Sequence, residues 1–278
     1  MTTKTLINGD WSETVSYSDR GLNYGDGLFE TIAVRHGKPV QWEQHWRRLQ
    51  QSCERMRFPV LDEAQWLADI AQLCAGQDTG VIKLIVTRGP AMRGYRLPEP
   101  VNLTRIVSFS VMPDYPESYW QQGVKLHLCE MRLGRNAHLA GMKHLNRLEH
   151  VLARAEWSDD NIVEGLLLDS EGYVIEGVIS NIFWVKDQQL FTPDLSQCGV
   201  VGVMRETVIQ LAQEMDISLN CGQYILRDLY AADEVFLTNS LVGIWPVRAL
   251  GGSRFDTSEQ AMPVTRKLQQ EIQRRFFV

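Results

Sequence analysis

The chain has 278 residues, which is enough for one large domain or two ordinary ones with full apolar cores. Apolar residues make up 44% and charged residues 22%, a balance that argues against a largely disordered chain. The 28 basic and 34 acidic side chains give a formal charge of −6. This charge argues against a general nucleic-acid binder, because such proteins need clustered positive charge.

The cysteine pattern predicts neither a disulfide framework nor a metal site. The five cysteines are odd in number, widely spaced and without a CxxC pair. They are Cys53, Cys74, Cys129, Cys198 and Cys221. The N-terminal segment lacks the apolar core of a signal peptide, and no apolar run approaches membrane-spanning length. We therefore expect a cytoplasmic protein without a membrane partner.

The apolar pattern of the N-terminal part combines helices with strands. Helical spacing from Trp42 to Met56 predicts one helix, and a second is expected over Asp62–Cys74. Val81–Thr87 and Thr104–Val111 are rich in β-branched residues and are predicted strands. Two prolines and several turn-forming residues make 112–118 the best candidate linker.

The part after this linker repeats the mixture of strands and helices. Strands are expected at Val124–Cys129, Gly165–Asp169, Tyr173–Ile175, Asn181–Val185 and Glu234–Thr238, and helices at Leu145–Trp157, Met204–Met215 and near the C-terminus. We therefore predict an α/β (α+β) protein with a smaller N-terminal α/β domain (1–111) and a larger C-terminal domain (119–278). Ligands often bind in the cleft between two such domains.

Several well-known catalytic and nucleotide-binding motifs are missing from the sequence. There is no GxSxG elbow, HExxH helix or GxxxxGK[ST] loop. The glycine-rich stretch Gly21–Gly27 lacks the spacing of a dinucleotide fingerprint. Its glycines permit a turn with positive φ or a close approach of the backbone to a ligand.

Lys143 is the lysine with the most suggestive surroundings among the seven in the chain. Lys83 and Lys125 lie within predicted strands, where each is expected on the exposed face. Lys143 follows the small residues of Leu139–Met142. Desolvation there would lower its pKa and provide a neutral amine for a Schiff base. The alternative is a long side chain that covers apolar surface and keeps its charge in solvent.

Three further segments carry polar groups that could serve a cofactor. Glu176 ends an apolar strand, where its carboxylate could pair with a protonated pyridine nitrogen or simply lie in solvent. Thr238–Ser240 is either a phosphate-binding strand end or a polar turn. Gly199–Gly202 precedes a helix, so it is either a phosphate-binding helix start or an ordinary cap.

Taken together and in order, these segments resemble fold-type IV pyridoxal-phosphate enzymes. The resemblance rests on Arg132–Leu148 around Lys143, on Glu176, and on Thr238–Ser240. Asp19–Glu30 and His45–Leu49 agree with it, so that it spans almost the whole chain. It implies a two-domain fold, the cofactor pyridoxal 5′-phosphate, a small-molecule substrate and a homodimer.

The resemblance also implies roles for individual residues. Lys143 would be the catalytic residue and would hold the cofactor covalently, while Glu176 would contact its pyridine nitrogen. The remaining implied cofactor residues are Arg48, Ile179, Asn239 and Ser240, which would contact the phosphate. The implied substrate residues are Tyr24, Phe29, Thr31, Arg93, Tyr95 and Asn239. Arg93 could present its planar guanidinium to a carboxylate, or lie on a surface loop without a ligand.

Within the family, Arg132–Leu148 and the loop Met92–Tyr95 resemble the lyases that release 4-aminobenzoate and pyruvate from 4-amino-4-deoxychorismate, a step toward folate. Phe29 stands where D-amino acid aminotransferases have a tyrosine, and Arg147 falls near a tyrosine of branched-chain aminotransferases. Both differences favour a lyase. An aminotransferase remains the first alternative, and a non-catalytic binding protein on the same fold is the second.

Overall fold

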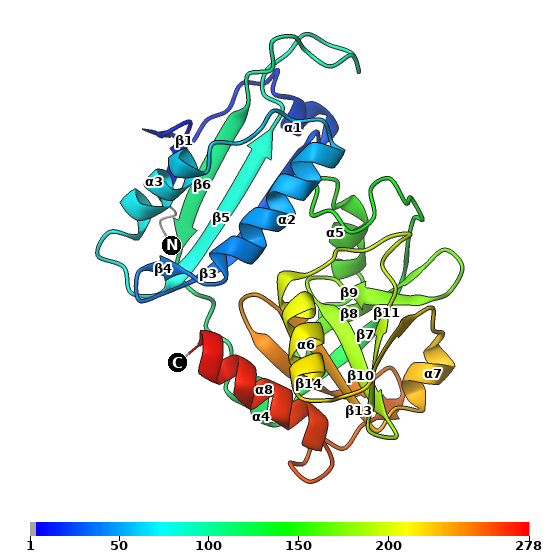
Figure 1. Ribbon diagram of the computed structural model, residues 1–278. Coiled ribbons are helices and arrows are strands. Elements are labelled where there is room, and N and C mark those ends of the chain that lie inside the picture. Colours follow the sequence, from blue (N-terminus) through cyan, green and yellow to red (C-terminus); the bar gives the residue numbers. More distant parts are fainter. Residues whose placement is uncertain (1–3, 278) are drawn as a thin grey trace. The chain divides into compact units, whose positions relative to one another are not determined.

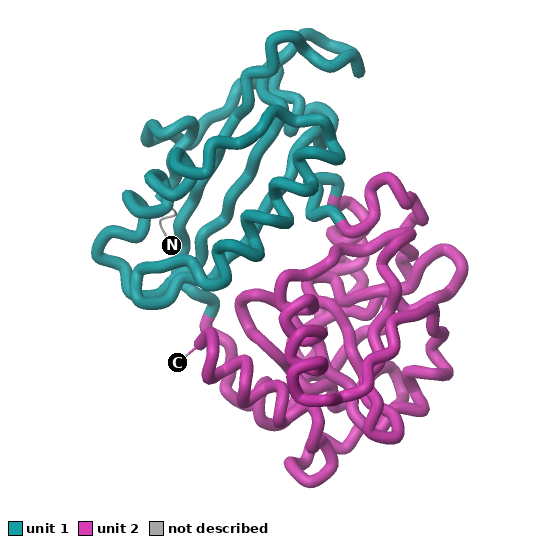
Figure 2. The backbone as a smooth tube through the Cα atoms, viewed as in Figure 1, with its two compact units in different colours: residues 1–113, 142–146 teal, residues 114–141, 147–278 magenta. Residues whose placement is uncertain are grey.

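The computed structural model describes residues 4–277 and contains two compact units (Figures 1 and 2). Unit 1 consists of the described residues up to Pro113 and the separate segment Met142–Asn146. Unit 2 consists of Asp114–Gly141 and the described residues from Arg147 onward. No helix in the described range is long and apolar enough to cross a membrane.

Unit 1 is an antiparallel sheet with helices on one face. Its strands follow the order β2-β1-β6-β5-β3-β4. They are β1 (Lys4–Ile7), β2 (Asp10–Trp11), β3 (Gly27–Arg35), β4 (Lys38–Pro39), β5 (Gly80–Thr87) and β6 (Thr104–Ser110), and the helices are α1 (Arg20–Tyr24), α2 (Trp42–Arg55) and α3 (Glu63–Cys74). The predicted helices from Trp42 and over Asp62–Cys74 are confirmed, with Asp62 as the N-cap of α3.

One core joins the sheet of unit 1 to α2 and α3. Alternate residues of β3 face these helices, because successive side chains of a strand point to opposite sides. Leu28 and Ile32 of β3 pack with Leu49 of α2 and Leu73 of α3, and all four are almost fully buried. Glu30 lies between them in the sequence, on the same face of the strand, so its carboxylate is carried into the core.

The helix predicted over Leu145–Trp157 is wrong at both ends. The observed α5 spans only Leu148–Arg154. Before it, Phe29 N donates to Lys143 O (2.9 Å) and Leu145 N donates to Gly27 O (3.0 Å). These main-chain groups bind the edge of β3 and are not available to a helix. Lys143 therefore lies on an extended segment beside β3.

Unit 2 contains a nine-stranded mixed sheet whose path closes on itself. The order is β12-β11-β10-β13-β14-β7-β8-β9, β15 pairs with β14, and β9 also pairs with β10. Its elements are α4 (Ser118–Gln121), β7 (Val124–Leu133), α5, β8 (Ile162–Asp169), β9 (Val174–Gly177), β10 (Asn181–Lys186), β11 (Gln189–Pro193), α6 (Val203–Glu214), β12 (Leu219–Gly222), α7 (Leu226–Tyr230), β13 (Glu234–Asn239), β14 (Gly243–Leu250), β15 (Ser253–Arg254) and α8 (Pro263–Phe276). The pairing of Glu176 with Asn181 closes the circuit of six strands.

Two apolar clusters lie on opposite faces of these strands. Ile182 and Trp184 of β10 belong to a cluster with members from all six strands of the circuit. Phe183 and Val185 point the other way and pack with residues of α6 and α8, which cover this face in Figure 1. The strict alternation along β10 explains why the strand is buried on both sides and has an almost continuous apolar sequence.

Candidate active site

Lys143 lies against an aromatic ring within unit 1. Its Nζ is 4.5 Å from the centroid of the Phe29 ring, and its main-chain oxygen accepts from Phe29 N. The same ring has Lys83 Nζ at 5.5 Å, with Lys83 exposed as expected from its strand position. Phe29 thus fixes both the backbone and the ammonium end of Lys143.

Arg48 belongs to a buried charged cluster with Glu30 and His45. Arg48 Nε donates to Glu30 Oε1 (2.8 Å), a second guanidinium nitrogen donates to Oε2, and His45 Nδ1 is 2.7 Å from Oε2. Burial alone would raise the pKa of Glu30, but Arg48 and His45 outweigh it and lower the pKa to about 2. Burial also lowers the pKa of His45, against the opposing effect of Glu30. Arg48 is thereby held in one orientation.

The substrate residues expected in unit 1 fall into two groups. Phe29 and Thr31 lie on the face of β3 opposite Glu30, with Phe29 near Lys143. Tyr24 ends α1, and its hydroxyl accepts from Gly94 N (2.9 Å) in the loop that carries Arg93. The Tyr24 and Tyr95 rings are 5.4 Å apart. The structure thus brings Tyr24 together with the loop and Phe29 together with Lys143.

Glu176 is a buried carboxylate at the closure of the sheet in unit 2. It is only 3% exposed. Its Oε2 accepts from Val200 N (2.8 Å) and Asn181 Nδ2 (3.3 Å), and its Oε1 is 3.2 Å from His150 Nε2. Three neighbours therefore fix the carboxylate. Glu176 does not lie in solvent, which excludes the simpler of the two interpretations given above.

Arg147 is the nearby cation in the same unit. Its burial lowers its pKa, while Glu176 and Glu149 favour its charged form. An arginine keeps its charge even when its pKa is lowered in this way. The surroundings of Glu176 therefore include a fixed positive charge, where branched-chain aminotransferases were expected to have a tyrosine.

Ile179 and Asn239 lie side by side, Ile179 just after β9 and Asn239 at the end of β13. Asn239 Nδ2 donates to Ile179 O (3.3 Å), and Asn239 Oδ1 accepts from Leu241 N and Val242 N. The amide of Ile179 donates to Glu164 Oε2 (3.1 Å). Ser240 directly follows β13. The structure thus groups Glu176, Ile179, Asn239 and Ser240 within one unit.

Glu164 was missed by the sequence analysis, although it organises this turn. Its carboxylate accepts from the amides of Gly165, Val178 and Ile179 and from Ser180 Oγ. Burial raises the pKa of Glu164 despite these hydrogen bonds. Nothing in the sequence distinguishes it from an ordinary strand acid, because its partners are mostly main-chain groups.

The start of α6 is the second feature whose importance the sequence shows only in part. Gly202 is its N-cap and no side chain caps it, so amides of the first turn remain without intrahelical partners. A Cβ on Gly202 would lie 2.0 Å from Asn181 Oδ1. Asn181 in turn donates to Glu176. The helix start and the buried carboxylate are therefore linked through one asparagine.

One group of possible metal ligands occurs among residues 4–277, formed by His127, Cys129 and Glu156. Glu156 accepts from Glu130 N (2.6 Å) and Met131 N (2.8 Å), which lie at an irregularity of β7. His127 Nε2 also lies 3.0 Å from Glu156 Oε2, so both carboxylate oxygens of Glu156 already have hydrogen-bond partners. We therefore assign Glu156 to main-chain stabilisation, and the absence of a metal stays a prediction.

Comparisons with known proteins agree over nearly the whole chain. Aminodeoxychorismate lyase of Vibrio harveyi is 36% identical over 268 residues, which cover 95% of this chain and 97% of that protein. The crystal structure of 4-amino-4-deoxychorismate lyase from Pseudomonas aeruginosa has a TM-score of 0.91 and 47% identity, with 97% and 98% of the two chains covered. Branched-chain amino acid aminotransferase of Escherichia coli gives a TM-score of 0.84 and 27% identity, with 98% and 94% covered.

The family model of class IV aminotransferases matches residues 27–250, which include Lys143, Glu176 and Ser240. The match covers most of the chain and both compact units. The order of segments noted in the sequence is thus confirmed as a family relationship, and so is the mixed α/β fold. The chain belongs to the class IV aminotransferase family, whose members are fold-type IV enzymes dependent on pyridoxal 5′-phosphate.

Proposed function

We propose that this protein is a pyridoxal-phosphate-dependent lyase that converts 4-amino-4-deoxychorismate to 4-aminobenzoate and pyruvate, a step toward folate. One observation carries the choice within the family. The sequence of this chain is 47% identical to that of a lyase of known structure but only 27% identical to that of a branched-chain aminotransferase, at similar coverage. Phe29 and Arg147 support the same choice, because they replace tyrosines expected in the two aminotransferase groups.

The described residues fit the cofactor on two counts. Glu176 is a buried carboxylate, the group that pairs with a protonated pyridine nitrogen. The α6 start offers amide donors beside a glycine where no Cβ fits, which suits a phosphate. We assign Lys143 to the covalent bond, Glu176 to the ring nitrogen, and Arg48, Ser240, Asn239 and Ile179 with the first amides of α6 to the phosphate.

When bound, pyridoxal phosphate supplies an aldehyde that condenses with amines and a ring that spreads negative charge. Glu176 would pair with the ring nitrogen and favour its protonated form. Lys143 Nζ removes the proton from C4 of the substrate and returns a proton to the departing enolpyruvyl group. Aromatisation of the product ring drives the reaction. All atoms of the substrate are found in the two products, so no second substrate takes part.

The substrate residues have the chemistry that a dicarboxylate requires. Arg93 presents a planar guanidinium to a carboxylate. Tyr24 contacts the loop that contains Arg93 and Tyr95, and Phe29 and Thr31 lie on the strand beside Lys143. We assign these five residues, together with Asn239, to binding of the substrate.

The test is incubation of the holoprotein with 4-amino-4-deoxychorismate in the absence of any keto acid. A lyase releases pyruvate and 4-aminobenzoate in equal amounts. No release of pyruvate, together with transfer from D-alanine or a branched-chain amino acid to 2-oxoglutarate, would instead identify an aminotransferase. Binding of the cofactor without either turnover would identify a non-catalytic protein.

We also propose that the protein is a cytoplasmic homodimer. Leu148, Val151 and Leu152 of α5 are exposed at helical spacing in the single chain, an arrangement suited to a second copy. The cysteines are free and four of them are buried, which supports a reducing compartment. Sedimentation of the purified protein tests the dimer, and Val151→Glu should produce a monomer.

A further inference from the structure

The loop that carries Arg93 is held to α1 mainly through the main chain of Gly94. Gly94 N donates to Tyr24 Oη (2.9 Å), and Gly94 O accepts from an Arg20 guanidinium nitrogen (2.8 Å). The same nitrogen lies 3.4 Å from Arg96 O. The side chains of Tyr24 and Arg20 on α1 therefore bind both the amide and the carbonyl of Gly94, which has a φ of +109°. Tyr95 itself stays 85% exposed.

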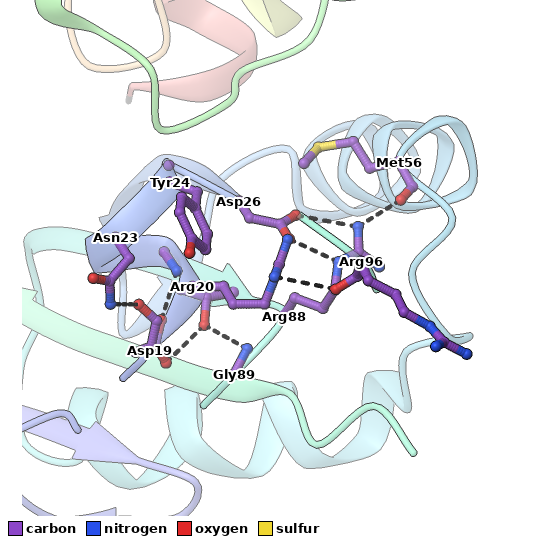
Figure 3. A network of polar contacts seen from close by, with 12 residues as sticks. Asp19, Arg20, Asn23, Tyr24, Asp26, Met56, Arg88, Gly89 and Arg96 are labelled. Carbon is purple, nitrogen blue, oxygen red and sulfur yellow. Dashed lines mark hydrogen bonds and ion pairs between the residues drawn. The ribbon is translucent and has the colours of Figure 1, made fainter. Parts of the chain in front are cut away.

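The guanidinium of Arg20 is in turn held by an ion pair with Asp26, which it shares with Arg88. Arg20 Nε donates to Asp26 Oδ2 (2.8 Å), and Arg88 Nε donates to the same oxygen (2.8 Å). Arg20 and Arg88 are 4% and 2% exposed. Figure 3 shows Asp26 between the two guanidinium groups, with Arg88 continuing to Met56 O at the end of α2. A buried arginine with these partners cannot swing away from the loop.

The residues just before the loop are also hydrogen-bonded to the chain around the start of α1. Arg20 N donates to Gly89 O (3.0 Å), and Ala91 N donates to Ser18 O (3.2 Å). Asp19 accepts from Thr87 Oγ1 (2.9 Å) and Thr104 Oγ1 (2.7 Å), the residues at the two ends of the strands that flank the loop. Only Met92 and Arg93, which are both exposed, lie between the hydrogen-bonded residues Ala91 and Gly94. The position of Arg93 is therefore set by its neighbours.

We infer that Arg20 is a positioning residue, which sets the conformation of the Met92–Tyr95 loop and thereby places Arg93 for a substrate carboxylate. Arg20 acts through the loop and does not itself meet the substrate, because its guanidinium is buried and committed to Asp26 and to loop carbonyls. The inference rests on the proposed function for the role of Arg93. The restraint of the loop by Arg20 is a separate claim, which rests on the structure alone.

The decisive variant is Arg20→Lys, which keeps a charge for Asp26 but loses the planar fork that reaches the loop carbonyls. Arg105→Lys is the matched control. Arg105 is a partly buried arginine of unit 1, with Nε 2.8 Å from Asp69 Oδ2, and it lies on β6, outside the loop. We expect Arg20→Lys to raise KM about tenfold and to change kcat by less than about twofold, because placement of a binding group is lost. Arg105→Lys should leave KM unchanged.

A double-mutant cycle separates positioning from general damage. If Arg20 acts through Arg93, then Arg20→Lys should raise KM by less than about twofold when Arg93→Gln is already present. An equal increase in KM in both backgrounds, or no increase in the wild-type background, would overturn the inference.

Limited trypsin digestion provides a readout that does not depend on turnover. Cleavage after Arg96 should be at least about fivefold faster in Arg20→Lys than in the wild type or in Arg105→Lys, because local opening exposes the loop to the protease. Equal rates would overturn the inference. A wild-type holoprotein that releases no pyruvate would reject the proposed function instead, and the digestion would still decide whether Arg20 restrains the loop.

Discussion

Phe29 holds Lys143 by two independent contacts, a main-chain hydrogen bond of 2.9 Å and a ring centroid 4.5 Å from Nζ. The hydrogen bond sets the extended conformation of the segment beside β3. The ring gives the ammonium group an apolar neighbour that still attracts positive charge. The contacts of Phe29 on β3 therefore set the position of Lys143 Nζ.

Phe29→Leu tests the contribution of the ring, because leucine keeps apolar bulk and the main-chain hydrogen bond. The ring positions Nζ, and a less well placed amine transfers a proton more slowly, so we expect kcat to fall by about two- to fivefold. Phe29→Tyr should retain most of the activity. Steady-state pyruvate release measures both variants, and an unchanged kcat in Phe29→Leu would refute a role for the ring.

Glu30→Gln should destabilise unit 1, because Arg48 and His45 lose their buried charged partner. The pKa of Glu30 is lowered from 4.5 to about 2, which corresponds to a loss of about 3 kcal/mol at neutral pH. Urea unfolding at pH 7 measures this loss. Glu13→Gln, at an exposed position of the same unit, is the control and should unfold like the wild type.

The same pair of proteins gives a pH prediction. A carboxylate with a lowered folded-state pKa stabilises the fold above its unfolded pKa, and this contribution is lost as the pH falls toward the folded value. The difference in unfolding free energy between wild type and Glu30→Gln should therefore be constant at neutral pH and shrink between about pH 4.5 and 2. A difference independent of pH over this window would contradict the assignment.

Glu176→Gln should impair chemistry more than cofactor binding. The amide is close in shape, but it cannot stabilise a proton on the ring nitrogen as a carboxylate does. We expect kcat to fall by about 100-fold or more, a typical size for the loss of one group that stabilises charge developing in the transition state. The amount of bound cofactor should change little, and a variant with normal kcat would show that Glu176 does not hold that proton.

Gly202→Ala tests the start of α6. The new Cβ would lie 2.0 Å from Asn181 Oδ1, so Asn181 or the helix start must move. Spectral titration with pyridoxal phosphate should show affinity at least about tenfold lower, because a phosphate bound at these amides depends on their geometry. Gly252→Ala is the matched control, with no atom within 4 Å of its Cβ. Equal affinities in the two variants would rule out this helix start as the phosphate site.

Local patterns predicted the helices well where one apolar face decides the structure. The helix from Trp42 and the helix after Asp62 have that face, and both formed as expected. The helix predicted from Leu145 began three residues too early, because Lys143 and Leu145 bond to β3. Propensity within a segment contains no information about such a distant strand. The buried strand β14, which contains a proline at 246, was not among the predicted strands.

The sequence suggested residue types for a candidate site but not the contacts that hold those residues in place. Lys143, Glu176 and Ser240 could be named because their chemistry and order are distinctive. Glu30 and Glu164 are ordinary acids in the sequence, and only the fold shows that one fixes Arg48 and the other binds the amide of Ile179. Roles that depend on main-chain partners or on remote side chains can be recognised only in the folded structure.

The most direct test of the account is the identity of the residue that carries the cofactor. Borohydride treatment of the holoprotein, followed by peptide mass spectrometry, should place the phosphopyridoxyl group on Lys143. Lys143→Ala should lose both this modification and the release of pyruvate, while its unfolding curve stays close to that of the wild type. Modification of another lysine, such as Lys83, with full activity in Lys143→Ala, would contradict the account.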